Sequence, residues 1–322
     1  SLFVTRMAPL ISIYLVHPQV SCWQMTQEEA DLLSAKMPDF QVLLCRSQEE
    51  FRRSLRLAEI AISWDFQQEW LEEAENLRII ATPAAGKDYF SLELPKHIQA
   101  RYGRFHGEIM AETAIGALLG ISRGLFSAVS EFSGQAWPEA ALSQQQVSLR
   151  GSHVALLGFG NIGQYIGRLL KAFGVRISAM RRDLKRPKPD WFESGDRLFT
   201  PAELELYLPE VDHLVLCLPR SPETDLILNR KRLALLPKHA SVSNFGRGNA
   251  IDLEALQEAL ETGRLKAAFL DVFPEEPIRA DSGFLRCKNL WRLPHLSAVS
   301  PNYMALFIED FVQQYRENAS GS

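Results

Sequence analysis

An apolar run long enough to span a bilayer is missing from the start of this 322-residue sequence. The run LISIYLV, residues 10–16, has one arginine before it and is much too short for a membrane helix, so a buried first strand is the simpler interpretation. No export or anchoring signal follows it. We therefore expect a cytoplasmic protein without a membrane partner.

Cysteine is scarce, and neither sign of charge dominates. Cysteine pairs of the CxxC kind and histidine clusters are absent, and the four cysteines lie far apart, at Cys22, Cys45, Cys217 and Cys287. This spacing suggests neither a zinc site nor a disulfide framework, so we expect no metal. The net charge of -4 provides no basic field, and the short basic run at residues 181–188 is too local for a nucleic-acid surface.

Short apolar runs alternate with amphipathic segments along the whole chain, which predicts α/β architecture with parallel sheets. The chain is long enough for two cores, since single cores rarely grow past about 250 to 300 residues. In the first part, LISIYLV, FQVLLC, IAISW and LRIIAT are predicted strands, and the loop AAGKDYF follows a strand end, where open α/β sheets usually place ligands. A long helical pattern over residues 107–132 and a polar connection over 133–146 come next, and we expect a change of domain near this helix.

The second part opens with an apolar strand that runs into Gly158, Gly160 and Gly163 and then into a helix. In a G-x-G-x-x-G turn the first glycine allows the tight turn, the second lets the backbone approach a pyrophosphate, and the third lets helix and strand pack closely. A glycine-rich turn without a ligand is the alternative, but the strand before and the helix after favour dinucleotide binding. Downstream, VDHLVLCLP, ASVSNF and AAFLDVF are predicted to be further buried strands.

Together these motifs resemble the D-isomer-specific 2-hydroxyacid dehydrogenases over essentially the whole chain. The resemblance rests on AAGKDYF, MAETAIGALLGISRG, GFGNIG, LPRSPETDLIL, NFGRGNAIDLEALQEALETGRLKAAFLDVFPEEP and LPHLSAVSP, in this order. It implies two Rossmann-like domains with doubly wound parallel sheets. The NAD(P)-binding domain, residues 108–298, would be inserted into a flavodoxin-like substrate domain, residues 1–107 and 299–322. It also implies a homodimer and an active site in the cleft between the domains.

The three catalytic residues of that family match Arg247 in NFGRG, Glu276 in DVFPEEP and His295 in LPHLSA. Reduction of a 2-oxo acid develops negative charge on the carbonyl oxygen, and His295 is the candidate acid that protonates it. Glu276 would orient the imidazole and favour its protonated form, and the planar fork of Arg247 would hold the substrate carboxylate and carbonyl oxygen. Taken singly, a surface arginine, a solvated acid and a core histidine are the alternatives.

Further roles are implied only by the resemblance. Asp271 matches an aspartate on the nicotinamide side, with a strand-end cap as the alternative. Pro219 and Thr224 match the loop over the adenine ribose, although both are good turn residues. The other residues expected at the cofactor are Phe159, Asn161, Ile162, Leu218, Phe245, Gly246 and Ser297.

The backbone of Ala85, Gly86 and Lys87 matches the family loop that binds the substrate carboxylate. Lys87 could face the pocket and favour an extra anionic group on the substrate, or point to solvent. The sequence departs from the common family pattern, without losing a catalytic group, at Lys87, Arg220, Phe245 and Leu293.

A pair of arginines stands where NAD-using relatives have an acidic residue that binds the ribose 2′-hydroxyl. Alignment through AFGVRISAM puts Arg181 at the acidic position and Arg182 beside it. A carboxylate there would repel a 2′-phosphate and two guanidiniums would grip it, so we expect NADP(H), with NAD(H) possible. The alternatives are a solvated basic turn, or Asp183 as an acceptor of the NAD type.

The predicted function is hydride transfer between NADP(H) and a small 2-oxo or D-2-hydroxy acid, and glyoxylate and hydroxypyruvate fit by resemblance. The rivals are a non-catalytic nucleotide-sensing protein and an oxidoreductase acting on formate or phosphite. Formate enzymes of this type have glutamine where Glu276 stands, which counts against that branch, whereas phosphite is compatible with the three residues.

Overall fold

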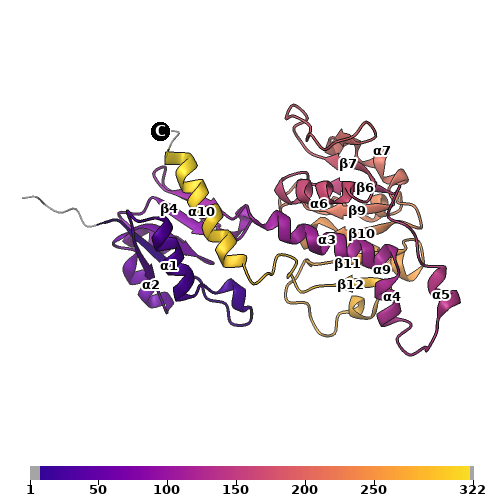
Figure 1. Cartoon of the computed structure of the whole chain (residues 1–322), viewed down its shortest axis with the longest axis horizontal. Coiled ribbons are helices and arrows are strands. Elements are labelled where there is room, and N and C mark those ends of the chain that lie inside the picture. The colour runs from indigo at the N-terminus through magenta and orange to yellow at the C-terminus, as the bar shows by residue number, and fades with distance from the viewer. Residues whose placement is uncertain (1–7, 320–322) are drawn as a thin grey trace, which may run out of the picture. The chain divides into compact units, whose positions relative to one another are not determined.

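The computed structural model describes residues 8–319, which form two compact units (Figure 1). Unit 1 takes in the chain up to His106 and again from Val299 on, and unit 2 is the continuous segment Gly107–Ala298. The sequence predicted that the domains divide after residues 107 and 298, and the two units divide after His106 and Ala298. Residues 1–7 and 320–322, which belong to the predicted substrate domain, lie outside the described residues.

Unit 1 is built on a five-stranded parallel sheet with the strand order β2-β1-β3-β4-β5. Its strands are β1 Leu10–Tyr14, β2 Gln41–Leu44, β3 Ala58–Ser63, β4 Ile79–Thr82 and β5 Gln99–Tyr102. This is the flavodoxin-like order, which confirms the class predicted for the first part of the chain. β3 is buried along nearly its whole length, as expected of a strand that is covered on both faces.

The helices of unit 1 come from both ends of the chain. They are α1 Gln27–Lys36, α2 Gln48–Ser54 and α10 Tyr303–Ala319, with short 3-10 turns at Ser21–Trp23, Gln68–Glu73 and Lys87–Tyr89. Thr26 begins α1 with a capping box. Its hydroxyl accepts a hydrogen bond from the amide of Glu29 at 3.3 Å, and the Glu29 carboxylate accepts one from the amide of Thr26 at 2.7 Å.

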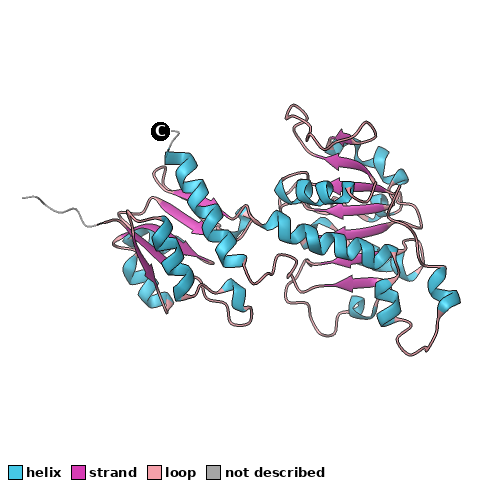
Figure 2. Cartoon of the chain, in the orientation of Figure 1, coloured by secondary structure: helices cyan, strands magenta, loops and turns pink. Residues whose placement is uncertain are grey.

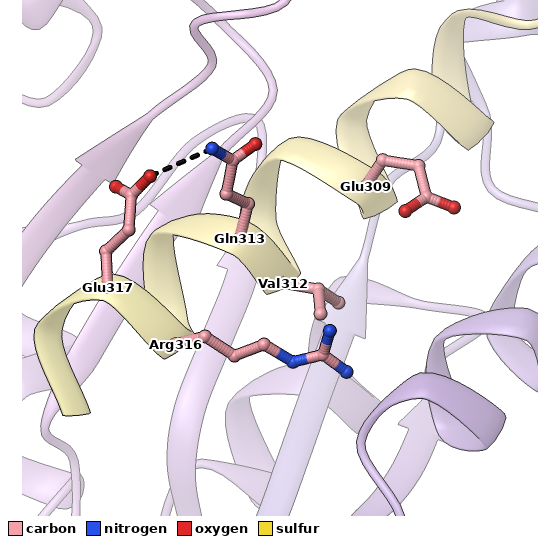
Figure 3. A pocket seen from close by; sticks show the side chains of 5 residues that line it. All are labelled: Glu309, Val312, Gln313, Arg316 and Glu317. Carbon is pink, nitrogen blue, oxygen red and sulfur yellow. Dashed lines mark hydrogen bonds between the residues drawn. The ribbon is translucent and has the colours of Figure 1, made fainter. Parts of the chain in front are cut away.

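α10 has an apolar face and a polar face. Met304, Phe307 and Phe311 lie in the same core as Ile11 and Ile13 of β1, so the far end of the chain completes the core of the N-terminal sheet. Figure 3 shows the side chains that line an open hollow on this helix, Glu309, Val312, Gln313, Arg316 and Glu317. Nε2 of Gln313 donates to the Glu317 carboxylate at 2.9 Å there.

Unit 2 holds a parallel sheet, whose strands are magenta in Figure 2. It has seven strands in the order β12-β11-β10-β9-β6-β7-β8. Its strands are β6 His153–Leu157, β7 Arg176–Met180, β8 Arg197–Phe199, β9 His213–Leu216, β10 Ser241–Asn244, β11 Ala267–Leu270 and β12 Leu290–Arg292. This is a doubly wound Rossmann order, as predicted, in which β6 and β9 flank the point where the strand order reverses. Ligands of such sheets bind beyond the carboxyl ends of the strands at that point.

Seven α-helices accompany this sheet within the described residues. They are α3 His106–Ser122, α4 Leu125–Ser130, α5 Glu139–Ser143, α6 Asn161–Lys171, α7 Leu204–Tyr207, α8 Arg230–Leu233 and α9 Leu253–Glu261. Short 3-10 turns lie at Pro201–Glu203, Leu208–Glu210, Gly248–Ala250 and Gly283–Arg286. Between residues 8 and 319, no helix combines the length and the apolar character that a membrane crossing requires.

The prediction of a single helix over residues 107–132 is wrong, because this stretch forms two helices, α3 and α4. Gly124 has a φ of 64°, a left-handed conformation that glycine adopts without the steric cost of a Cβ atom, and it separates α3 from α4. The polar stretch that follows is more than a connection, since it contains α5.

Candidate active site

The turn between β6 and α6 is tight on one side and open on the other. Gly158 has a φ of 97°, and a Cβ atom there would lie 2.6 Å from the carbonyl oxygen of Cys217. A Cβ atom at Gly163 would lie 2.1 Å from the carbonyl oxygen of Gly158, so the helix packs directly on the turn. At Gly160 it would meet nothing within 4 Å, and this residue begins α6 without a side-chain cap. The first amides of α6 are thus uncapped beside open space, which suits an anionic group.

The loop after β9 borders the same turn. The Thr224 hydroxyl donates to the carbonyl oxygen of Pro219 at 2.8 Å and accepts from the amide of Ser221 at 3.0 Å, which closes the loop. Leu218 is buried, and a Cβ atom at Gly246 would lie 2.4 Å from its carbonyl oxygen. The predicted ribose loop and the NFGRG turn therefore pack against each other at the carboxyl edge of the sheet.

Some of the residues predicted at the cofactor direct their side chains into the protein. Phe245 is 2% exposed and stacks on Phe269, with the ring centroids 5.7 Å apart. Phe159 is also buried, and the Ile162 side chain packs on the same core. The Asn161 side chain lies beside Gly107, where its oxygen would be 2.5 Å from an added Cβ atom. For Phe245 and Phe159, contact with a ligand would have to come from the backbone.

Arg181 and Asp183 both bind within their own loop. Arg181 directly follows β7, and its guanidinium donates to the carbonyl oxygen of Pro187 at 3.2 Å and to that of Arg186. Asp183 accepts from the amide of Lys185 at 2.9 Å, which makes a tight turn. Arg181 therefore closes the loop that carries the basic residues.

Arg182 is exposed, and its charge acts on Glu223 in the loop that Thr224 closes. The pKa of the Glu223 carboxyl lies below its ordinary value, first because Ser221 donates a hydrogen bond to it and also because of the positive charge of Arg182. The cation after β7 and the loop after β9 are therefore close enough to interact electrostatically, across the strand β6 that carries the glycine turn.

The three predicted catalytic residues meet in unit 2. Nδ1 of His295 lies 2.7 Å from Oε2 of Glu276, and the other carboxylate oxygen of Glu276 accepts from the amide of Phe273 at 2.8 Å. The Arg247 guanidinium donates to the carbonyl oxygen of Gly246 at 3.0 Å. These three residues follow β10, β11 and β12, which are neighbours in the sheet, so their shared edge brings them together.

The charges of His295 and Glu276 support each other. The pKa of His295 is raised above its ordinary value, chiefly by the hydrogen bond to Glu276, while desolvation and the charge of Arg247 oppose the shift. Burial acts to raise the pKa of Glu276, but the hydrogen bonds from His295 and from the Phe273 amide outweigh it, and the net pKa is lowered. Protonated His295 beside ionised Glu276 is therefore the favoured pair, with the cation of Arg247 close by.

The family model "D-isomer specific 2-hydroxyacid dehydrogenase, NAD binding domain" matches residues 115–297, more than half of the chain. The chain belongs to this family. This confirms the predicted class of oxidoreductase. The residues that match the NAD-binding domain model all lie in unit 2, which spans Gly107–Ala298.

Similar proteins agree with this 2-hydroxyacid dehydrogenase assignment. The D-3-phosphoglycerate dehydrogenase of Methanocaldococcus jannaschii is 29% identical over 277 residues, which are 85% of this chain and 48% of that protein, so the chain spans about half of its length. The hydroxypyruvate reductase of Thermotoga maritima is 29% identical over 278 residues, 84% of this chain and 82% of that protein. The crystal structure of a D-isomer specific 2-hydroxyacid dehydrogenase family protein from Aeromonas salmonicida subsp. salmonicida A449 superposes with a TM-score of 0.80 at 27% identity, covering 98% and 97% of the two chains.

In this dehydrogenase, Asp271 holds the loop that carries His295. Asp271 is fully buried, and its carboxylate accepts from the amides of Leu296 at 2.8 Å and Ser297 at 3.1 Å. Its carbonyl oxygen accepts from the amide of His295 at 2.8 Å. His295 itself has a φ of 58°, in the left-handed region that non-glycine residues rarely adopt. The position of Asp271 fits the strand-end cap, and contact with the nicotinamide stays a prediction.

Two side chains that support this site were missed by the sequence analysis. Asn244 accepts from the amide of Gly246 at 3.0 Å and donates to the carbonyl oxygen of Arg247 at 3.0 Å, which shapes the turn before the arginine side chain. Asparagine side chains often bind the backbone of a following turn, so the asparagine before the NFGRG glycine could have indicated this role. Thr113 of α3 donates to the carbonyl oxygen of Ser297 at 2.9 Å, and nothing in its helical sequence context marks it.

The predicted substrate loop lies in unit 1, directly after β4. Gly86 precedes the 3-10 turn Lys87–Tyr89, and its carbonyl oxygen accepts from the amide of Tyr89 at 3.2 Å. Ala85 and Lys87 are exposed within this unit. The loop thus occupies the carboxyl end of a parallel strand, the usual ligand edge of such sheets.

Proposed function

We propose that this dehydrogenase is a reductase that converts small 2-oxo acids, of the glyoxylate or hydroxypyruvate kind, to D-2-hydroxy acids with NADP(H). The observation that carries the proposal is the 2.7 Å contact between His295 Nδ1 and Glu276, with Arg247 beside both. That cluster combines a proton donor, the carboxylate that keeps it protonated and a cation for an anionic substrate. The hydroxypyruvate reductase of Thermotoga maritima, at 29% identity, supports the substrate class.

Because Glu276 binds Nδ1 of His295, the other ring nitrogen, Nε2, is the one available to a substrate. Bound NADP(H) would supply the hydride to C2 of the oxo acid. His295 Nε2 then gives its proton to the oxygen that becomes the hydroxyl. Glu276 stabilises the imidazolium before this transfer and keeps the neutral ring in the same orientation after it, through the Nδ1–H hydrogen bond. Arg247 neutralises the carboxylate of the substrate and fixes its orientation with two parallel hydrogen bonds.

The residues present fit a dinucleotide. The uncapped amides of α6, beside the open space at Gly160, would hold the pyrophosphate. The loop closed by Thr224 would lie along the adenine ribose, and Arg182, whose charge acts on Glu223 of that loop, would bind the 2′-phosphate. Arg181, in this proposal, contributes by closing its loop as well as by its charge.

The remaining parts of the proposal concern assembly and location. Unit 1 would be the substrate domain and unit 2 the cofactor domain, with residues 85–87 binding the substrate carboxylate. A homodimer is supported by three apolar side chains of unit 2 that are strongly exposed in the single chain, Leu125 at 55%, Val129 at 74% and Trp137 at 83%. A cytoplasmic location and the absence of nucleic-acid partners rest on the cysteine spacing and the charge of the sequence.

The test is an assay of the purified protein with NADPH and NADH against a panel of 2-oxo acids, alongside His295→Gln. The wild-type protein should reduce at least one small 2-oxo acid and prefer NADPH. The variant should lose roughly 100-fold to 10,000-fold in kcat while it still binds NADPH, because only the proton transfer is removed. Near-wild-type turnover by His295→Gln would rule out its role as the acid, and absence of any 2-oxo acid reduction would overturn the proposed reaction.

A further inference from the structure

The loop between β7 and β8, residues 181–196, carries the basic residues expected at the cofactor and is fixed to the nucleotide unit at several points. We propose that Trp191 is a positioning residue that sets the preference for NADP(H) by holding this loop against α6 and the glycine turn. The inference rests on the proposed use of NADP(H). It concerns a side chain that would not itself touch the cofactor.

Trp191 packs against both α6 and the glycine turn that precedes this helix. A Cβ atom at Gly167 of α6 would lie 2.7 Å from the edge of the Trp191 indole, so the ring lies directly on the helix backbone. The indole is also edge-on to Phe159, the residue between the first two glycines of the turn, at a centroid distance of 5.9 Å. Phe192 packs on both rings, 5.0 Å from Trp191 and 5.5 Å from Phe159. The loop is thereby linked through aromatic contacts to the turn that would hold the pyrophosphate.

Asp196 fixes the far end of the loop. It is 2% exposed, and its carboxylate accepts from the amides of Ile177 and Glu193, both at 2.8 Å. Nζ of Lys171, at the end of α6, lies 2.9 Å from the same carboxylate. A buried acid with an ion-pair partner and two amide donors is a strong anchor, because removing any partner would leave charge uncompensated.

Between the end of β7 and Trp191 the loop exposes Arg182, Lys185 and Lys188. Like charges on a short segment repel and favour its extension into solvent, so an unanchored loop would not keep them near the turn. Pro187 and Pro189 narrow the backbone freedom of the same stretch. The pyrophosphate and the 2′-phosphate of NADP(H) are joined through the adenine ribose. A basic loop fixed to the glycine turn can bind the 2′-phosphate while α6 binds the pyrophosphate, without first being ordered.

This arrangement predicts a loss that is specific to one cofactor. NADH has no 2′-phosphate, so displacement of the basic loop leaves its binding to α6 and the Thr224 loop intact. NADPH loses its cationic partners when the loop moves. A purely structural role of Trp191 would instead weaken both cofactors together.

The experiment compares wild type with Trp191→Ala, Trp191→Phe and the control Leu206→Ala, which removes an exposed apolar side chain on α7 of the same unit. Trp191→Leu, which keeps apolar volume on Gly167, replaces the alanine variant if that variant does not fold. kcat/KM is measured with NADPH and with NADH under one 2-oxo acid. In parallel, trypsin cleavage after Arg182 and Lys185 is followed by mass spectrometry, since exposed mobile loops are cut fastest.

Trp191→Ala should lower kcat/KM for NADPH about tenfold or more, leave that for NADH within about twofold, and speed cleavage of the loop. Trp191→Phe should restore most of both properties, and Leu206→Ala should match wild type in both. Equal losses for the two cofactors, or unchanged preference and cleavage, would overturn the role of Trp191 while leaving the proposed function intact. A wild-type protein that prefers NADH would instead overturn the proposed cofactor, and this role with it.

Discussion

Replacing Glu276 by glutamine tests whether the Glu276 carboxylate keeps His295 protonated. The substitution keeps the shape of the side chain and an oxygen that can accept from the Phe273 amide, but it removes the negative charge 2.7 Å from His295 Nδ1. Because Glu276 is the main reason that the pKa of His295 is raised, that pKa should fall in the variant. His295 must be protonated to act as the acid in reduction, so activity should be lost at a lower pH than in wild type.

The size of the effect follows from the contact and its exposure. A hydrogen bond to a charged group contributes about 1.5 to 3 kcal/mol, and the side chains of His295 and Glu276 are 45% and 35% exposed, which places this pair at the lower end. About 1.4 kcal/mol corresponds to a factor of ten. We therefore expect kcat for reduction to fall roughly tenfold at neutral pH, with a smaller change in KM because Arg247 remains to bind the substrate carboxylate.

The assay is the pH dependence of kcat/KM for 2-oxo acid reduction in wild type, Glu276→Gln and the control Glu275→Gln, which neutralises the adjacent exposed acid. The alkaline limb of the profile should move to lower pH in Glu276→Gln alone. If the limb stays in place, or if Glu275→Gln moves it equally, the pairing of Glu276 with His295 does not control the acid.

Three further outcomes follow from the structure. Arg247→Lys keeps the charge and loses the planar donor fork, so KM for the oxo acid should rise substantially, and unchanged kcat and KM would remove Arg247 from the site. Arg181→Asp should lower kcat/KM for NADPH and shift the preference toward NADH. The substitution removes the hydrogen bonds from Arg181 to the carbonyl oxygens of residues 186 and 187, which close the loop, and it adds a charge that repels the 2′-phosphate. An unchanged preference would show that the loop does not bind the 2′-phosphate. His213 is buried, and burial lowers its pKa from 6.5 to about 4. Between these two pH values His213 is protonated in the unfolded chain but not in the folded protein. The free energy of unfolding should therefore fall by roughly 2 to 3 kcal/mol as pH drops through that window. Urea unfolding at pH 7 and pH 4.5 measures this, and His213→Gln should have a weaker pH dependence.

The sequence was sufficient for the parts of the fold that local patterns encode. Strand, glycine turn and helix follow one another from His153 to Lys171, and Gly163 packs on the carbonyl oxygen of Gly158 within that short segment. Arg247 and Glu276 could be predicted because each follows a predicted strand, and the carboxyl ends of adjacent parallel strands share an edge. His295 was indicated by its motif LPHLSA. The three-residue strands β8 and β12 are too short for a periodic pattern, and they are defined by their neighbours in the sheet.

Contacts between distant segments could not be predicted. Nothing local shows that Trp191 would lie on Gly167, since that contact depends on how the whole β7–β8 loop folds back on α6. The direction of a long side chain is equally undetermined by sequence. Arg181 and Arg182 are adjacent, yet the first binds the carbonyl oxygens of its own loop and the second is exposed, where its charge acts on Glu223 in the loop after β9.

The return of the chain to unit 1 affects how the protein is made. α10 supplies core residues to a sheet whose strands all lie before His106, and the 192 residues of Gly107–Ala298 separate the two. At a translation rate of about 5 to 20 residues per second, the nascent sheet waits roughly 10 to 40 s for its covering helix. During that time the apolar face around Ile11 and Ile13 stays open on the ribosome, while unit 2, continuous in sequence, can already fold. We therefore expect the N-terminal sheet to expose its apolar face for longer during synthesis than any part of unit 2.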